Sequence, residues 1–143
     1  MNSTQKAYLA GFLDGDGSIY VRLKKNDTYR YGYQISPYIV LFQSAKSKVK
    51  FEQLCNMIEL GNMRIRKDGI MEYTIGKIES LIQFLKLVKP YVILKRDQVE
   101  LMQNILKIKK TIKSKEDFER LVLEIKKFRN LNYSKVEKNY LTP

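Results

Sequence analysis

Small residues at every fourth position of one segment constrain the fold of this chain more than any other feature. Ala7, Gly11 and Gly15 recur at this interval around the run Tyr8-Leu9-Ala10-Gly11-Phe12-Leu13-Asp14-Gly15-Asp16-Gly17-Ser18-Ile19. A helix would align them on one face, where a second helix could approach backbone to backbone. The sequence therefore predicts a helix over residues 3–14 that packs closely against another helix.

Two acidic residues mark the predicted end of this helix. Gly15 and Gly17 are expected to stop it beside Asp14 and Asp16, because glycine tolerates the backbone angles of a sharp exit. A carboxylate beside a phosphate-binding surface is a natural site for a divalent cation. An EF-hand loop is excluded, because Ile19 and Lys25 stand where that loop requires glycine and glutamate.

Periodicity predicts a single α+β domain over residues 1–143. Alternation over 19–26 and 33–42 predicts one hairpin, in which Pro37 argues for a local edge or bulge. A second hairpin is expected to join 63–66 to 71–75 through Asp68-Gly69. Helix-period stretches cover 46–58, 79–88, 96–110 and 116–129, whereas 131–143 is expected to form a flexible tail. The two hairpins would form one four-stranded antiparallel sheet with helices on one face.

Composition narrows the function classes. The 27 Lys and Arg residues outnumber 15 acidic residues, for a net charge of +12, so the expected partner is nucleic acid first and an acidic membrane surface second. No histidine is present, which excludes Ser-His-Asp and Cys-His catalysis. Cys55 has no partner for an internal disulfide, and no apolar run could span a membrane. We expect an intracellular protein of an organelle or of a bacterial or archaeal cytoplasm.

The run Leu9-Ala10-Gly11-Phe12-Leu13-Asp14-Gly15-Asp16-Gly17 closely resembles the signature of the LAGLIDADG homing endonucleases, and the flanking Tyr8 and Ser18-Ile19 also fit. The resemblance covers roughly residues 5–130 and includes the order of elements. A single motif is similar to the homodimeric branch, which group I introns encode. The resemblance implies an αββαββα core with additional C-terminal helices. It also implies two motif helices at a two-fold axis and a sheet that straddles duplex DNA.

The resemblance also assigns candidate site residues. Asp16 matches the aspartate that binds catalytic Mg²⁺, and Gly15 would offer its backbone carbonyl to the metal. Asp14 matches the earlier acidic position, with helix capping or interface packing as its expected role. Gln43 matches the residue that positions the attacking water, and Lys95 matches the lysine that stabilises the transition state. The implied dimer interface comprises Ala7, Tyr8, Ala10, Gly11, Asp14 and Gly15.

One position departs from the family pattern. Some relatives have an arginine early in the second helix, where this chain has Ser47 between Lys46 and Lys48. Either lysine could replace the arginine as a point charge, without the forked guanidinium.

The outer face of the predicted sheet would bind the DNA, since Arg, Gln and Tyr on an antiparallel ribbon can meet base edges in the major groove. The candidates are Tyr20, Arg22, Lys24, Asn26, Tyr29, Arg30, Gln34, Ser36, Tyr38, Val40, Arg64, Arg66, Lys67, Glu72 and Thr74. A further lysine-rich stretch would either contact phosphates or form a solvated helix end, and it contains Lys107, Lys109, Lys110, Lys113 and Lys115.

The resemblance thus favours a site-specific homing endonuclease that hydrolyses both strands of a long pseudo-palindromic DNA site, leaves short 3′ overhangs and promotes intron homing. Mg²⁺ is the expected cofactor, Mn²⁺ is expected to substitute, and Ca²⁺ is expected to support binding without cleavage. One alternative is an RNA maturase that assists splicing, with intron RNA as partner. Another is a non-cleaving DNA-binding regulator, which would have no need of Asp16, Gln43 and Lys95 together.

Overall fold

Four antiparallel strands form one sheet in the order β1-β2-β4-β3. β1 (Gly17–Lys25) pairs along its whole length with β2 (Tyr33–Ser44), and β3 (Asn62–Ile65) pairs with β4 (Ile70–Ile75). β4 joins the two hairpins by pairing with the second half of β2. This computed structural model describes residues 1–132, so nearly all of the tail predicted for 131–143 lies outside the described residues.

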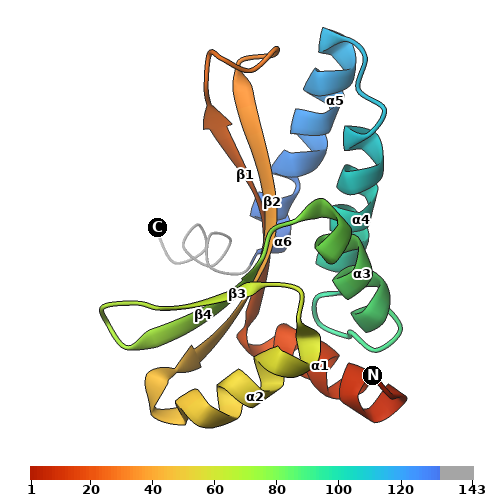
Figure 1. Ribbon diagram of the computed structural model, residues 1–143. Helices are drawn as coiled ribbons and strands as arrows, with labels where there is room; N and C mark the ends of the chain where they lie inside the picture. Colours follow the sequence, from red (N-terminus) through yellow and green to blue (C-terminus); the bar gives the residue numbers. More distant parts are fainter. Residues whose placement is uncertain (133–143) are drawn as a thin grey trace, which may run out of the picture.

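Helices cover one face of the sheet (Figure 1). At the lower end in that view lie α1 (Ser3–Asp16), the short 3-10 turn η1 (Ala45–Ser47) and α2 (Lys48–Ile58). The other helices are α3 (Ile78–Val88), α4 (Arg96–Lys109), α5 (Lys115–Lys126) and α6 (Phe128–Leu131). The predicted α+β class and order of elements are confirmed. Over residues 1–132, no helix combines the length and the apolar character needed to cross a bilayer.

The hydrophobic core fills the space between the sheet and the helices. The strands contribute alternate residues, among them Ile19, Ile39 and Ile75, and the helices contribute residues such as Leu9 and Phe84. Each of these five side chains is at most 1% exposed. Burying a side chain of this size stabilises the fold by about 1.5–3 kcal/mol. Because side chains alternate along a strand, the residues between them face away from the helices.

α1 continues for two residues past its predicted end, through Gly15 to Asp16. The expectation that glycine backbone angles end it is wrong, since Gly17 is extended, with φ −113° and ψ 165°. Position 17 requires glycine for a different reason, which is the lack of space for a side chain. A Cβ atom there would lie 2.6 Å from Leu13 Cδ1 and 2.8 Å from the Leu13 carbonyl oxygen, so only glycine lets β1 leave α1 this closely.

The two hairpins follow the turn residues. Pro37 pairs in regular register with Val21, in the part of β2 that precedes its pairing with β4 at Ile39. It therefore lies at a local edge, as predicted, where no neighbouring strand requires its missing N–H. In the second hairpin Gly69 has φ +83°, a left-handed conformation that glycine adopts without strain, which confirms the turn predicted at Asp68-Gly69.

Candidate active site

Asp14 holds the segment that precedes α4. Its carboxylate accepts hydrogen bonds from the backbone N–H groups of Ile93, Leu94 and Lys95, at donor–acceptor distances of 2.9, 3.1 and 3.0 Å. α4 has no capping side chain at its own N-cap, and a carboxylate at a helix N-terminus satisfies free donors and complements the dipole. Of the two roles predicted for Asp14, the structure shows capping, and the cap belongs to a distant helix. Its assignment to the dimer interface stays a prediction.

Lys95 lies beside the end of α1. Its Nζ donates a hydrogen bond to the backbone carbonyl of Asp14 over 2.7 Å. Burial lowers the pKa of this ammonium, while the charges of Asp14 and Asp16 act in the opposite direction. The side chain is thus a half-buried cation fixed close to both aspartates. With Asp14, Gly15 and Gly17 it lines a cleft of about 420 Å³.

Asp16 is free where Asp14 is bound. It is exposed, and within residues 1–132 its carboxylate accepts no hydrogen bond and forms no ion pair. It also ends a helix whose last turn contains no basic residue, so its charge adds to the negative end of the helix dipole. Carboxylate and backbone carbonyl oxygens suit Mg²⁺, and the Gly15 carbonyl lies in the last turn, where helical partners are missing. The residues therefore fit a divalent cation.

One chain supplies only part of such a site. In the described part of the chain, no group of three or more Asp, Glu, Cys or His residues could hold a metal ion. Three of the roughly four acceptor sites of the Asp14 carboxylate are already taken by backbone donors. A complete coordination shell thus needs oxygen atoms from another molecule.

The exposed face of α1 is smooth. Ala7, Gly11 and Gly15 are exposed, and a Cβ atom added to either glycine would meet no atom within 4 Å. Tyr8 beside them is 61% exposed. Ala10 is 0% exposed, and its assignment to the dimer interface is wrong, because it lies one helical position away from the stripe and packs into the core of its own chain.

Gln43 and the two candidate lysines lie near the start of α2. Gln43 stands two residues beyond Leu41, which pairs with the first residue of β1, Gly17, so it lies at the same end of the sheet as Asp16. Its side-chain oxygen accepts a hydrogen bond from the N–H of Ser44, and it makes no hydrogen bond to Asp16 in the described residues. Lys48 Nζ lies 3.8 Å from Glu52, whereas Lys46 forms no ion pair within residues 1–132.

The outer sheet face carries the predicted polar side chains in register. Across β1 and β2, Tyr20 pairs with Tyr38 and Arg22 with Ser36, and across β3 and β4 Arg64 pairs with Glu72. Arg22 and Arg64 are exposed. The remaining predicted residues on this face and its tips are Lys24, Asn26, Tyr29, Arg30, Gln34, Arg66, Lys67 and Thr74.

Val40 is a wrong assignment to the DNA-contacting set. It lies on the outer face, but its exposed fraction is only 5%. The reason is its place on a central strand, where Ser18 of β1 and Thr74 of β4 flank it. Tyr20 is also partly withdrawn from the face, since its ring lies 6.3 Å from that of Phe128 in α6.

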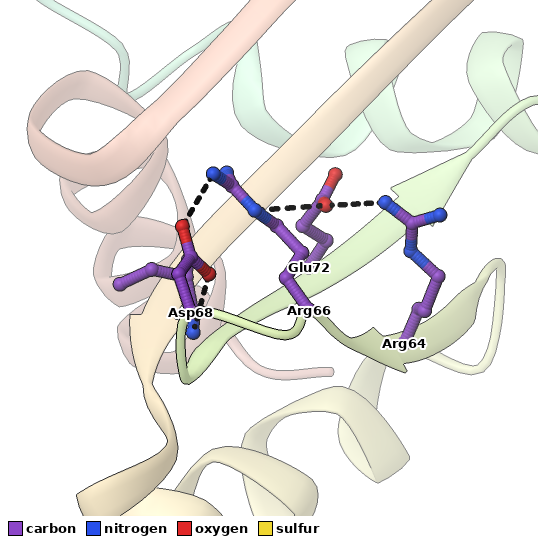
Figure 2. A network of polar contacts seen from close by, with 5 residues as sticks. Arg64, Arg66, Asp68 and Glu72 are labelled. Carbon is purple, nitrogen blue, oxygen red and sulfur yellow. Dashed lines mark hydrogen bonds and ion pairs between the residues drawn. The ribbon is translucent and has the colours of Figure 1, made fainter.

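Glu72 organises the arginines of the second hairpin (Figure 2). Its carboxylate accepts a hydrogen bond from Arg64 over 3.0 Å and lies 3.7 Å from Arg66 Nε. Arg66 also donates to Asp68 over 2.6 Å. A carboxylate repels phosphate, so this geometry gives Glu72 the role of orienting two guanidinium groups rather than of binding the DNA backbone.

The tip of the first hairpin rests on α5. The rings of Tyr31 and Phe118 stack with centroids 5.1 Å apart, and the Arg30 guanidinium lies 5.4 Å from the Tyr31 ring centroid. The helical periodicity over 116–129 gave no sign of this contact at Phe118. It fixes the position of a long hairpin that would otherwise project alone.

Comparison with known proteins agrees with this geometry. The family model described as LAGLIDADG endonuclease matches residues 9–102. The chain belongs to this family. The match begins in α1 and ends in α4, so it contains Asp16, Gln43, Lys95 and all four strands.

Two LAGLIDADG relatives are similar in sequence. DNA endonuclease I-CreI of Chlamydomonas reinhardtii is 33% identical over 99 residues, which is 69% of this chain and 60% of that protein. DNA endonuclease I-CvuI of Chlorella vulgaris is 33% identical over 101 residues, 71% of this chain and 63% of that protein. The chain thus spans about three fifths of the length of these relatives.

Solved LAGLIDADG structures share the fold. A crystal structure of I-CvuI in complex with the I-CreI target, determined in the presence of Mg with the DNA not cleaved, has a TM-score of 0.85 and 28% identity, over 92% of this chain and 83% of that one. The structure of I-TnaI has a TM-score of 0.78 and 22% identity, over 93% of this chain and 91% of that one, which supports the fold alone.

Sequence reasoning missed Ile93 and Leu94 in this LAGLIDADG chain. Both are bound to Asp14 through their backbones, yet their side chains are 78% and 70% exposed. Large apolar side chains this exposed mark an interaction surface when they cluster. The available signal was an apolar pair directly before Lys95, in a segment without helical or strand periodicity.

Proposed function

We propose that two copies of this chain form a Mg²⁺-dependent DNA endonuclease that cuts both strands of a long pseudo-palindromic site. Short 3′ overhangs and promotion of intron homing are part of this proposal. The observation that carries it is the Asp16 carboxylate, which has no partner within residues 1–132 and lies at the negative end of α1 next to a stripe of small exposed residues. Both relatives are named DNA endonucleases, which supports the same activity for this chain.

Dimerisation would occur through the exposed face of α1. Gly11 and Gly15 permit close helix contact, and Tyr8, Ile93 and Leu94 offer apolar area beside them. A two-fold axis along this face would bring two Asp16 carboxylates together, which supplies the oxygen atoms that one chain lacks.

The active-site residues would then divide the work. A divalent cation held by the Asp16 carboxylates and the Gly15 carbonyls would neutralise phosphate charge and stabilise the leaving oxygen. Lys95 would hold a positive charge near the same phosphate, where charge develops in the transition state. Gln43 would orient the attacking water with its amide. Lys46, unpaired in the described residues, is the better substitute for the missing arginine than Lys48 beside Glu52.

The outer sheet face would read the duplex through the major groove. Arg22 and Lys24 of β1 and Arg64 of β3 project from two strands of this face. Arginine forms bidentate hydrogen bonds with guanine, and lysine can contact guanine or phosphate. A basic chain with a net charge of +12 binds DNA with a steep salt dependence.

Selection for cleavage from a randomised duplex library tests the proposal, with the wild type compared with Asp16→Asn in Mg²⁺ and in Ca²⁺. The wild type is expected to cut one two-fold-related site in Mg²⁺ only. Asp16→Asn should lower the rate about 100- to 1,000-fold, the usual effect of losing one electrostatic stabiliser, and should still bind the site.

Asp27→Asn is the matched control, since it removes the same charge from an exposed turn residue, and it should cut normally. Cleavage by Asp16→Asn at the wild-type rate would refute the metal role. Selective binding by the wild type without any cleavage would favour the DNA-binding regulator.

A further inference from the structure

A basic groove of about 320 Å³ runs between α3 and α4. Lys86 and Lys89 line it from α3, and Lys107 and Lys110 line it from α4. All four side chains are exposed. Within each pair the lysines stand three residues apart, which places them on neighbouring turns of one helix face, about 5–6 Å apart. The groove thus presents two lysine pairs from two helices.

The positive charge of this groove is not compensated. No carboxylate lines it, and none of the four lysines forms an ion pair within residues 1–132, although six such pairs are formed elsewhere there. Favourable interaction with the helix dipoles accounts for a single lysine near each helix end. Helix dipoles do not explain why four lysines surround one groove. Binding of an anion with several charges would explain it.

The groove lies on the helical side of the molecule. Leu81, Phe84 and Val88 of α3 are buried in the core with the inward face of the sheet, and Figure 1 shows α3 and α4 on one side of the strands. A duplex on the outer sheet face could not curve back to this groove, because duplex DNA is stiff over about 150 base pairs. Any polyanion here is a second ligand.

We propose that this groove binds the phosphodiester backbone of single-stranded RNA. A single strand is flexible and narrow enough for a groove of this volume, and most single-stranded polynucleotide in a cell is RNA. Lysine is a point charge that contacts phosphates without selecting bases. The side chain of Ile82 also lines the groove and is 37% exposed, so it can contact a ribose or a base.

An acidic membrane is the less suitable partner. Membrane-surface helices bury a wide apolar face in the lipid. In this groove Ile82 is the most exposed large apolar side chain, with an exposed fraction of 37%. The other two apolar side chains, Leu85 and Leu106, are buried in the core. The recessed shape favours a strand over a flat lipid surface.

Fluorescence anisotropy of the full chain with a labelled oligouridylate tests the proposal. The oligonucleotide has about 20 nucleotides, longer than the roughly 4–16 that one binding module covers. An excess of unlabelled duplex DNA occupies the outer sheet face. The groove variant carries Lys→Gln at positions 86, 89, 107 and 110. The matched control carries Lys→Gln at positions 50, 77, 126 and 127, which lie outside the groove.

The groove variant should bind the oligouridylate at least about tenfold more weakly than the control, with a salt slope lower by about 2.8, since each phosphate contact on a single strand contributes about 0.7. This slope corresponds to about 50-fold between 50 and 200 mM salt. Duplex binding should be equal in the two variants, and circular dichroism should show equal folding. If the fourfold variant unfolds, Lys86→Gln with Lys107→Gln should give half the change in slope.

Three results would overturn the proposal. Equal loss in the groove and control variants would show that only net charge matters. Unchanged binding in the groove variant would place the RNA elsewhere. Loss of binding to vesicles with acidic lipid, without loss of oligouridylate binding, would assign the groove to a membrane surface.

Discussion

The inner and outer sides of the α1 C-terminus have opposite properties, although a single residue separates their two aspartates. On the inner side Asp14 is held by three backbone N–H groups before α4, with Lys95 on its carbonyl. On the outer side Asp16 has no such partner among the described residues, and Gly11 and Gly15 leave bare backbone. The inner carboxylate serves folding, and the outer one is left for a ligand. Position along the chain therefore says less about the role of an acidic residue than the donors around it.

Gly11→Leu tests the outer side and has the largest expected effect. Inside the chain nothing lies within 4 Å of the new Cβ, so the monomer should fold. In a dimer packed through α1, overpacking costs about 1–3 kcal/mol for each copy, which raises the dissociation constant at least about 30-fold. Sedimentation equilibrium measures this change. The control is Gln53→Leu, which adds the same side chain at an exposed position of α2. If Gly11→Leu dimerises with unchanged affinity, α1 does not form the interface.

A comparison of the stabilities of Asp14→Ala and Asp16→Ala tests whether the two aspartates have different roles. Asp14→Ala should lower the free energy of unfolding by about 2 kcal/mol, as expected for loss of a helix cap and a charged acceptor that are partly exposed to water. Asp16→Ala should leave stability unchanged or raise it by up to about 1 kcal/mol, because a negative charge leaves the C-terminus of a helix.

Urea denaturation at one protein concentration measures both variants. Equal protein concentration matters because dimer formation adds to apparent stability. Equal destabilisation by the two substitutions would mean that both aspartates serve folding, and the contrast would be lost.

The smallest expected effect is the contribution of Lys95 to the pH dependence of the free energy of unfolding. Burial lowers the pKa of Lys95 below its ordinary 10.5, so the unfolded chain binds more protons than the folded one in the alkaline range just below 10.5. Stability relative to Lys95→Met should therefore rise with pH through that range. The difference between the two unfolding curves isolates this group, and a falling difference would contradict the burial effect.

Local patterns were enough to predict most of the fold. The alternation in β1 and β2, the Asp68-Gly69 turn and the apolar stripe of α5 each reflect contacts within a few residues. Asp16 lies in a motif that the family match contains, and its role in binding metal stays a prediction.

The predictions that were wrong or incomplete share a different cause. Each depends on contact with distant parts of the chain, which local sequence patterns do not specify. The donors that bind Asp14 lie 79–81 residues further along. Ala10 and Val40 were assigned to surfaces by spacing, but packing against other elements buries both. Gly17 was expected for its backbone angles, whereas the closeness of Leu13 is what requires it.

The pairing of Arg64 and Arg66 with Glu72 and Asp68 has a kinetic consequence if the protein reaches its proposed site by sliding along DNA. This hairpin carries three cations, Arg64, Arg66 and Lys67, and the carboxylates of Glu72 and Asp68 pair with the two arginines. Because its net positive charge is small, the hairpin binds only weakly to DNA of arbitrary sequence. Exposed pairs of this kind are worth at most about 1 kcal/mol, so a matching guanine can take an arginine from its carboxylate. At a mismatched base the arginine returns to its internal partner instead of remaining unpaired. The hairpin would thus move rapidly past wrong sequences and tolerate variation in its target.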